Sequence, residues 1–289
     1  MQNPIVSWLF ETDAVRVCPQ DHPLWYTSGK LGPFYINAQF LYGSEAAANA
    51  LLETIERACA GDKLAFYDTV WADIEAQLAS CPIYAQLIDL LADAARGLDV
   101  DFVSGGERRD FFFSMPVARK LGMGHLAIFK DLTSVYTDVD GKSVLGEQAN
   151  LAGKRALHVA DLVTVASSYL RAWIPAVKAL GAQVTQSLAV VDRDQGGVDI
   201  LKSAGCPLTV LVTVKPELFE MARDLGRITD EQVALVKAFM ADPDAFMNDF
   251  LLAHPDFLAK EIAGGGKNAK RAELCIASGF APEAALPKK

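Results

Sequence analysis

The sequence predicts an α/β fold in which a mostly parallel sheet is flanked by helices. The first observation is the alternation of short apolar strands with helices between residues 100 and 213, which is typical of parallel strands joined by crossover helices. The second is that the strands run into polar or glycine-rich loops at residues 105–106, 161–168 and 192–197. Ligands of open α/β sheets bind at the carboxyl ends of the strands, so we expect the functional site at these loops.

Helices dominate the chain before residue 99. Apolar residues recur at helical spacing over residues 44–60, where Ser44 can cap the helix and Gly61 can end it. The turn-rich segment YTSGKLGPFYIN precedes this helix and leads into a strand that we expect to begin at Phe34. The other expected elements are a short helix over residues 4–12 and further helix over 65–96, with a break at 81–82.

Five short strands alternate with helices and loops in the middle of the chain. They are expected at residues 100–104, 125–129, 155–159, 187–192 and 208–213. Their connections are a Gly-Gly turn with a helix over 114–123, a polar loop over 131–146, a helix that ends at Gly181 and a short helix that ends at Gly205. From residue 216 onward, capping prolines and acids predict a run of helices, in which GGGKNAKR, residues 264–271, is expected to form a flexible, solvated turn.

Residues 156–184 have the layout of a phosphate-binding strand, loop and helix. An apolar run leads to Asp161, the following loop carries the hydroxyl groups of Thr164, Ser167 and Ser168, and an amphipathic helix follows. A helix N-terminus offers unpaired N–H groups and the positive end of the helix dipole to an anion. Hydroxyl and acidic residues before a helix also commonly act as caps, so both interpretations stand at this point.

Composition narrows the class of protein. The chain has 289 residues, is 51% hydrophobic and carries a net charge of −9, so it can bury a large core but lacks the basic surface of a nucleic-acid or anionic-membrane binder. The N-terminus does not resemble a secretion signal, and no apolar run approaches a membrane span of about 18 residues. The five cysteines are scattered and form no CxxC pair. We therefore expect a cytoplasmic protein with reduced thiols and no metal cluster, with His125 and His158 as core residues of apolar strands.

Four motifs follow one another between about residue 20 and residue 215. They are SGKLGPFYIN, a Gly-Gly pair followed by a helix, VADLVTVASS, and VVDRDQGGVDILKSAG. This ordered set resembles the orotate phosphoribosyltransferases, which belong to the type I phosphoribosyltransferase family. The resemblance implies the fold of that family: an N-terminal hood with a helical insertion over residues 1–98, an α/β core over 99–215 and a helical C-terminal extension over 216–289.

The resemblance also implies a reaction and a homodimer. Phosphoribosyl pyrophosphate (PRPP), with Mg²⁺, would lose diphosphate to a pyrimidine base, and the protein would act through positioning and electrostatics. Carried over by position, the 5′-phosphate would be held by Thr164, Val165, Ala166, Ser167 and Ser168, and Asp161 would meet the ribose hydroxyls. The diphosphate side would hold Arg108, Arg109 and Lys130. The base would be bordered by Ser28, Lys30, Phe34, Tyr35 and Arg193, whose guanidinium suits a planar carboxylate.

The chain departs from the family's pattern at four places. Ala160 stands where the family has the first of two acids, and Ala166 replaces the loop glycine. A Cβ at that glycine disfavours positive φ and close approach of the backbone to phosphate. Thr27 replaces a lysine, and the segment FKDLTSVYTDVDGKS is poor in cations. Loss of one cation that would face the diphosphate costs about 3–4 kcal/mol of transition-state stabilisation.

Three functions therefore stay open. The first is phosphoribosyl transfer in nucleotide synthesis or salvage. The second is a non-catalytic regulatory protein that binds a nucleotide or a sugar phosphate. The third is a fold kept only as an oligomerisation scaffold. In the first two, the expected partner is a small phosphate ligand, with no nucleic acid and no membrane.

Overall fold

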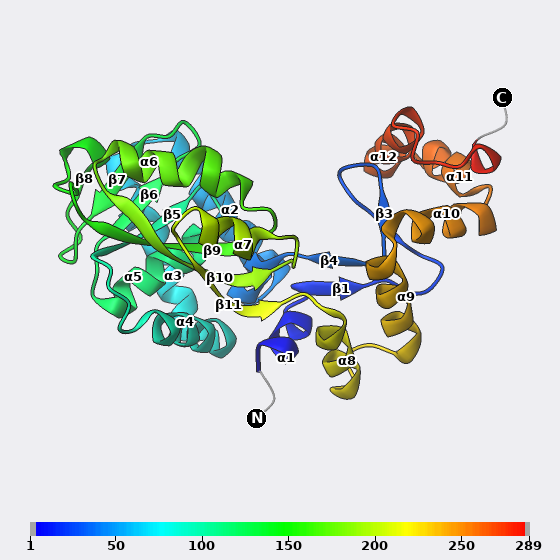
Figure 1. Ribbon diagram of the computed structural model, residues 1–289, viewed down its shortest axis with the longest axis horizontal. Coiled ribbons are helices and arrows are strands. Elements are labelled where there is room, and N and C mark those ends of the chain that lie inside the picture. Colours follow the sequence, from blue (N-terminus) through cyan, green and yellow to red (C-terminus); the bar gives the residue numbers. More distant parts are fainter. Residues whose placement is uncertain (1–3, 287–289) are drawn as a thin grey trace. The chain divides into compact units, whose positions relative to one another are not determined.

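The computed structural model describes residues 4–286, which form two compact units (Figure 1). Unit 1 contains Asn37–Lys215 together with the N-terminal residues up to Ala14, and unit 2 contains Val15–Ile36 and the described residues from Pro216 onward. This grouping differs from the three consecutive segments expected over 1–98, 99–215 and 216–289. The physical reason is a shared core, because Trp25 and Leu31 are buried together with residues such as Leu251.

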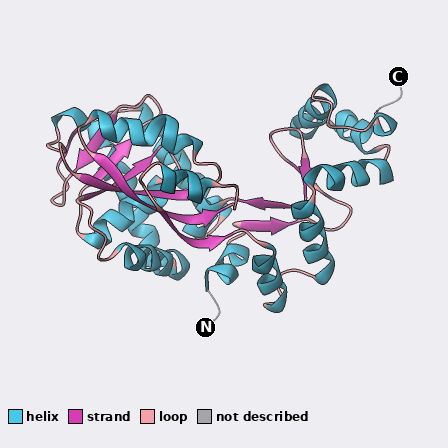
Figure 2. Ribbon diagram, in the orientation of Figure 1, coloured by secondary structure: helices cyan, strands magenta, loops and turns pink. Residues whose placement is uncertain are grey.

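Unit 1 is built on a seven-stranded sheet with the strand order β11-β10-β9-β5-β6-β7-β8. Five strands run parallel: β5 (Phe102–Gly106), β6 (His125–Ile128), β9 (Arg155–Val163), β10 (Gln183–Asp192) and β11 (Leu208–Thr213). The sheet appears as the group of long arrows in Figure 2. A mostly parallel sheet flanked by helices is the predicted fold class, which is confirmed.

The remaining two strands form an antiparallel hairpin at one edge of the sheet. β7 (Ser134–Thr137) pairs with β6 and with β8 (Ser143–Leu145). The sequence predicts a polar loop over 131–146, and for these two strands that prediction is wrong. Each strand is only three or four residues long and mixes apolar with polar residues, so hydrophobic periodicity over such short runs carries little signal.

Helices cover both faces of the sheet. Figure 1 shows α6 (Ile174–Ala179) on one side and α3 (Phe66–Ser80), α4 (Pro82–Ala95) and α5 (Phe111–Leu121) on the other. The other helices of unit 1 are α1 (Pro4–Glu11), α2 (Glu45–Ala60) and α7 (Gly197–Ser203). The hydroxyl of Ser44 accepts a hydrogen bond from the N–H of Ala47 at the start of α2, as expected for an N-cap.

The end of β5 is packed too tightly for side chains. A Cβ at Gly105 would lie 2.1 Å from the hydroxyl oxygen of Ser114, and one at Gly106 would lie 2.3 Å from the indole of Trp173. The two glycines lie in the strand, so the turn predicted at this pair is wrong. Both positions need glycine because a side chain would not fit there. The turn follows at residues 107–110, and α5 begins at Phe111 rather than near residue 114.

Unit 2 combines two short hairpins with the C-terminal helices. β1 (Val15–Val17) pairs with β4 (Phe34–Ile36), and β2 (Leu24–Trp25) pairs with β3 (Leu31–Gly32). The helices are α8 (Pro216–Asp224), α9 (Asp230–Ala241), α10 (Pro243–Ala253), α11 (Phe257–Gly264) and α12 (Gly266–Ala277). The flexible turn expected over 264–271 is wrong for residues 266–271, which form the first turns of α12.

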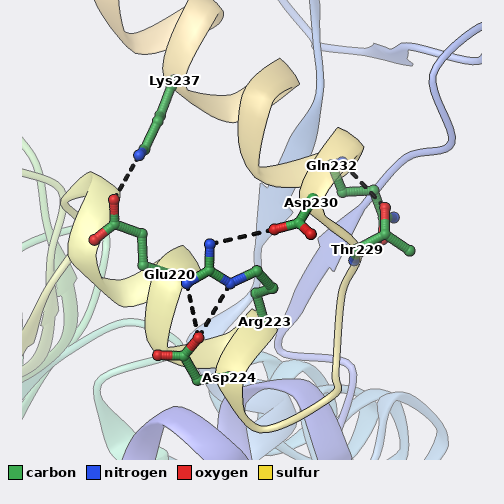
Figure 3. A network of polar contacts seen from close by, with 7 residues as sticks. All are labelled: Glu220, Arg223, Asp224, Thr229, Asp230, Gln232 and Lys237. Carbon is green, nitrogen blue, oxygen red and sulfur yellow. Dashed lines mark hydrogen bonds and ion pairs between the residues drawn. The ribbon is translucent and has the colours of Figure 1, made fainter.

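Charged side chains connect α8 with α9 (Figure 3). Arg223 contacts Asp224 on its own helix and Asp230 at the start of α9, and Lys237 lies 2.5 Å from Glu220. Gln232 caps α9 together with Thr229 and donates to the carbonyl of Val17 at 2.9 Å. Exposed ion pairs individually contribute little stability. We therefore infer that these pairs mainly set the orientation of α8 and α9 within unit 2.

None of the helices between residues 4 and 286 is both long enough and apolar enough to cross a membrane.

Candidate functional site

A pocket of 390 Å³ lies at the carboxyl ends of β5 and β9 in unit 1. Its walls are formed by residues 107–110, Lys130, residues 160–164, residues 166–169 and Trp173. The pocket is thus placed where open α/β sheets bind their ligands. It has the size of a cavity that accepts a small molecule.

The pocket brings together residues that the sequence places far apart. Asp161, Thr164, Ala166, Ser167 and Ser168 line it on the β9 side. The predicted diphosphate-side residues Arg108, Arg109 and Lys130 line it from the ends of β5 and β6. Val165 does not line the pocket, and its side chain is 46% exposed. Any contact of Val165 with a ligand would therefore involve its backbone.

The loop after β9 keeps a left-handed turn without a glycine. Ala166 has φ +51° and is buried at 4% exposure. This backbone conformation costs a residue with a Cβ about 1–2 kcal/mol. Gly197, at the start of α7, packs behind the loop, since a Cβ there would lie 2.5 Å from the carbonyl oxygen of Thr164. The loop therefore holds its turn through packing from behind rather than through its own sequence.

The hydroxyl groups of the loop are available for a ligand. Ser168 stands at the N-terminal boundary of the helical turn η4 (Tyr169–Trp173), and its side chain makes no capping hydrogen bond. Within residues 4–286, the hydroxyls of Thr164 and Ser167 make none either. The capping interpretation is therefore not supported, and three hydroxyl groups have hydrogen-bonding capacity to spare.

Asp161 lies beside a second carboxylate that the sequence did not single out. The backbone N–H of Asp161 donates to Oδ1 of Asp110 at 3.2 Å, and Asp110 is 8% exposed. Burial, and then the charge of Asp110, raise the pKa of Asp161 well above its usual range, while Arg109 opposes that rise. The only sequence signal for Asp110 was an acid directly before a helix, which is common.

Two of the three cations in the pocket already have acidic neighbours. Arg108 pairs with Glu56, and Nζ of Lys130 lies 3.6 Å from Oε1 of Glu107. Glu107 also accepts a hydrogen bond from the backbone N–H of Lys130 at 2.9 Å. Arg109 is exposed and makes no ion pair with residues 4–286. It is therefore the pocket cation whose charge is most open to an anion.

The five predicted base-binding residues divide between the two units. Ser28, Lys30, Phe34 and Tyr35 belong to unit 2, and Arg193 belongs to unit 1. In unit 2, Lys30 lies 2.6 Å from Asp244, and Phe34 is buried against Phe219 and Phe239. In unit 1, the backbone N–H of Arg193 donates to the carbonyl of Val163 at 2.9 Å, and Arg193 does not line the 390 Å³ pocket.

Both strand histidines are core residues, as predicted. His125 is 1% exposed and pairs with Ser114 at 2.9 Å, and burial lowers the pKa of His125 to about 3. Nδ1 of His158 lies 3.0 Å from the hydroxyl of Ser104, and its ring packs against Tyr169 and Trp173. His158 thus packs against two residues that line the pocket.

The pocket fits Mg²⁺ only together with phosphate groups. Within residues 4–286, no group of three or more His, Cys, Asp or Glu residues is placed to hold a metal ion. Mg²⁺ commonly binds through one or two carboxylates and the phosphates of a substrate. Asp161 and Glu107 are pocket carboxylates of the type required, so the donor set suits an ion that arrives with a phosphorylated ligand.

A parallel α/β sheet with a hydroxyl-rich loop, an acid and arginines at its carboxyl edge defines a phosphoribosyltransferase-like protein. No family model matches the chain. Relatives include an adenine phosphoribosyltransferase of Oenococcus oeni, 31% identical over 124 residues that cover 40% of this chain and 70% of the relative. An orotate phosphoribosyltransferase of Rhodopseudomonas palustris is 28% identical over 131 residues, which cover 44% of this chain and 70% of the relative. The chain belongs to the type I phosphoribosyltransferase family.

A solved structure agrees at the level of the fold. The UMP synthase of Leishmania donovani superimposes with a TM-score of 0.56 at 17% identity. The match covers 82% of this chain and 41% of that chain. At this identity the likeness concerns the fold alone.

Proposed function

We propose that this protein transfers a phosphoribosyl group from PRPP to a nitrogenous base, with orotate as the base. The observation that carries the proposal is the single pocket in which a hydroxyl-rich loop, Asp161 and three cations meet. Relatives named for adenine and for orotate transfer both support the reaction class. The choice of orotate rests on the SGKLGP and DR-x-x-GG motifs of the sequence.

In this proposal, each wall of the pocket holds one part of PRPP. The hydroxyls of Thr164, Ser167 and Ser168, with the backbone of Val165 and Ala166, hold the 5′-phosphate. Asp161 accepts hydrogen bonds from ribose hydroxyls and stabilises positive charge that develops on the ribose carbon. Fixed charges of this kind act on the transition state without reorganisation.

The opposite wall holds the leaving group. Arg108, Arg109 and Lys130 face the diphosphate, and Arg109 contributes a charge that forms no ion pair within residues 4–286. Mg²⁺, when bound with PRPP, would supply further neutralisation of the diphosphate. The Arg193 guanidinium is proposed to bind the carboxylate of the base, and a homodimer is the proposed assembly.

A second function is favoured by the ion pairs of the pocket. Arg108 pairs with Glu56 and Lys130 lies beside Glu107, which leaves little free positive charge for a diphosphate. A non-catalytic protein that binds a nucleotide or a sugar phosphate needs only the loop after β9.

Release of labelled diphosphate from PRPP separates these functions. The protein is incubated with PRPP, Mg²⁺ and either orotate or adenine, and diphosphate is measured over time. Base-dependent release with orotate supports the proposed transfer, and release with adenine alone overturns the choice of base. Absence of release, combined with PRPP-dependent thermal stabilisation, supports the binding function.

A further inference from the structure

Asp110 connects the end of β5 to the side of β9. Its Oδ2 accepts a hydrogen bond from the N–H of Gly106 at 3.1 Å, and its Oδ1 accepts one from the N–H of Asp161 at 3.2 Å. Oδ2 also lies 3.4 Å from Nε2 of His158. These contacts fix the carboxylate in a wall of the 390 Å³ pocket, which Asp110 lines together with Asp161.

The carboxylate of Asp110 lies beside Ala160. Residues two apart on a strand share one face, so His158 and Ala160 point to the same side of β9. Asp110 contacts the ring of His158 and also the peptide N–H that directly follows Ala160. Ala160 lines the pocket with only a methyl group. The small residue at position 160 thus leaves the space that the carboxylate from position 110 occupies.

A second polar group at this place lacks a partner. Tyr169 is 3% exposed and lines the same pocket, and its hydroxyl makes no hydrogen bond within residues 4–286. Burial and the nearby carboxylate of Asp110 raise the pKa of Tyr169 well above its usual range. The hydroxyl oxygen is itself buried, so Tyr169 forms part of the wall beside Asp110 and is not counted as a ligand contact.

We propose that Asp110 is the second carboxylate of the sugar site. Together with Asp161, it accepts hydrogen bonds from hydroxyl groups of a pentose phosphate whose phosphate lies on the loop after β9. A carboxylate offers several acceptor positions, so Asp110 can keep its two backbone donors and still bind a hydroxyl. This inference rests on the proposed function, because it uses the same phosphate loop.

The ratio of two affinities tests the inference. Ribose 5-phosphate and inorganic phosphate are titrated calorimetrically into the wild-type protein and into the Asp110→Asn variant. We expect ribose 5-phosphate to bind about tenfold more weakly to the variant, since a charged hydrogen bond is lost, while the affinity for inorganic phosphate changes by less than about twofold. Asp199→Asn, an exposed acid on α7 outside the pocket, is the matched control and should change neither affinity.

Two results would overturn two different assignments, the sugar-site role of Asp110 and the phosphate loop. Equal weakening of both ligands by Asp110→Asn, or no change in their ratio, overturns the sugar-site role of Asp110. A wild-type protein that does not bind inorganic phosphate overturns the proposed phosphate loop itself, and the sugar site with it.

A double-mutant cycle keeps the inference testable if Asp110→Asn alone destabilises the fold. Ala160→Asp is introduced into the wild-type protein and into the Asp110→Asn background, and unfolding by urea is measured. We expect Ala160→Asp to destabilise the wild-type protein more than the Asp110→Asn background, because only the former brings two carboxylates together. The double variant should also regain preference for ribose 5-phosphate over phosphate. Strictly additive effects with no regained preference would show that the two positions do not share one space.

Discussion

At the scale of single residues, Ala166 makes the loop after β9 less stable than a glycine at the same position would. Its φ of +51° lies in the left-handed region, which glycine adopts without a steric penalty. Ala166→Gly should stabilise the protein by about 0.5–1 kcal/mol, since relief of the strain outweighs the entropy that glycine adds to the unfolded chain. Urea unfolding measures the change. Ala176→Gly, inside α6, should instead destabilise by about 1 kcal/mol, and an equal effect at both positions would contradict the account.

The carboxylate of Asp161 makes stability depend on pH. Because burial and the charge of Asp110 raise the pKa of Asp161 in the folded protein, its contribution is greatest below the usual pKa of an aspartate, near 4, and is lost as the pH rises through the folded pKa. Asp161→Asn should remove this loss. Between about pH 5 and pH 8, the free energy of unfolding of the variant should therefore rise relative to the wild type, by on the order of 1 kcal/mol. A difference that is constant with pH would show that Asp161 keeps an ordinary pKa.

At the scale of elements, the contact between the end of β5 and η4 shapes the pocket. A Cβ at Gly106 would lie 2.3 Å from the indole of Trp173, which lines the pocket. Gly106→Ala should cost about 1–3 kcal/mol of stability and weaken phosphate binding by displacing the indole. Thermal unfolding and calorimetric titration measure the two effects. Gly264→Ala, at the end of α11 with open space around it, should be neutral or stabilising, and a similar loss in both variants would argue against this contact.

The elements that could be predicted from sequence are those with long, consistent patterns. The parallel strands and the helix that ends at Gly181 follow from apolar runs and end signals. The hairpin β7–β8 could not be predicted, because its strands are three and four residues long. Within the site, the hydroxyl loop and Asp161 follow from local order in the sequence. Asp110 does not, because its place in the pocket depends on contacts with Asp161 and His158 that form only in the folded sheet.

At the scale of the whole molecule, the site residues of unit 1 form a pocket, whereas four of the five proposed base-binding residues belong to unit 2. With a net charge of −9, the protein as a whole does not attract anions. Recognition of a phosphate ligand must therefore come from local groups, chiefly the hydroxyl loop and Arg109.

Arg109→Ala should weaken PRPP binding about tenfold or more and leave inorganic phosphate binding nearly unchanged in calorimetric titrations. An equal loss for both ligands would place Arg109 at the 5′-phosphate instead.

The loop after β9 is proposed to bind the 5′-phosphate of PRPP. Thermal unfolding with increasing PRPP tests it most directly, in the wild type and in the double variant Thr164→Val with Ser167→Ala. Ligand at about a hundred times its dissociation constant should stabilise the wild type by about 2.7 kcal/mol. The double variant should show much less stabilisation at the same concentration, because two of the three hydroxyl donors of the loop are gone. Equal stabilisation of both proteins, or none of the wild type, would contradict the claim.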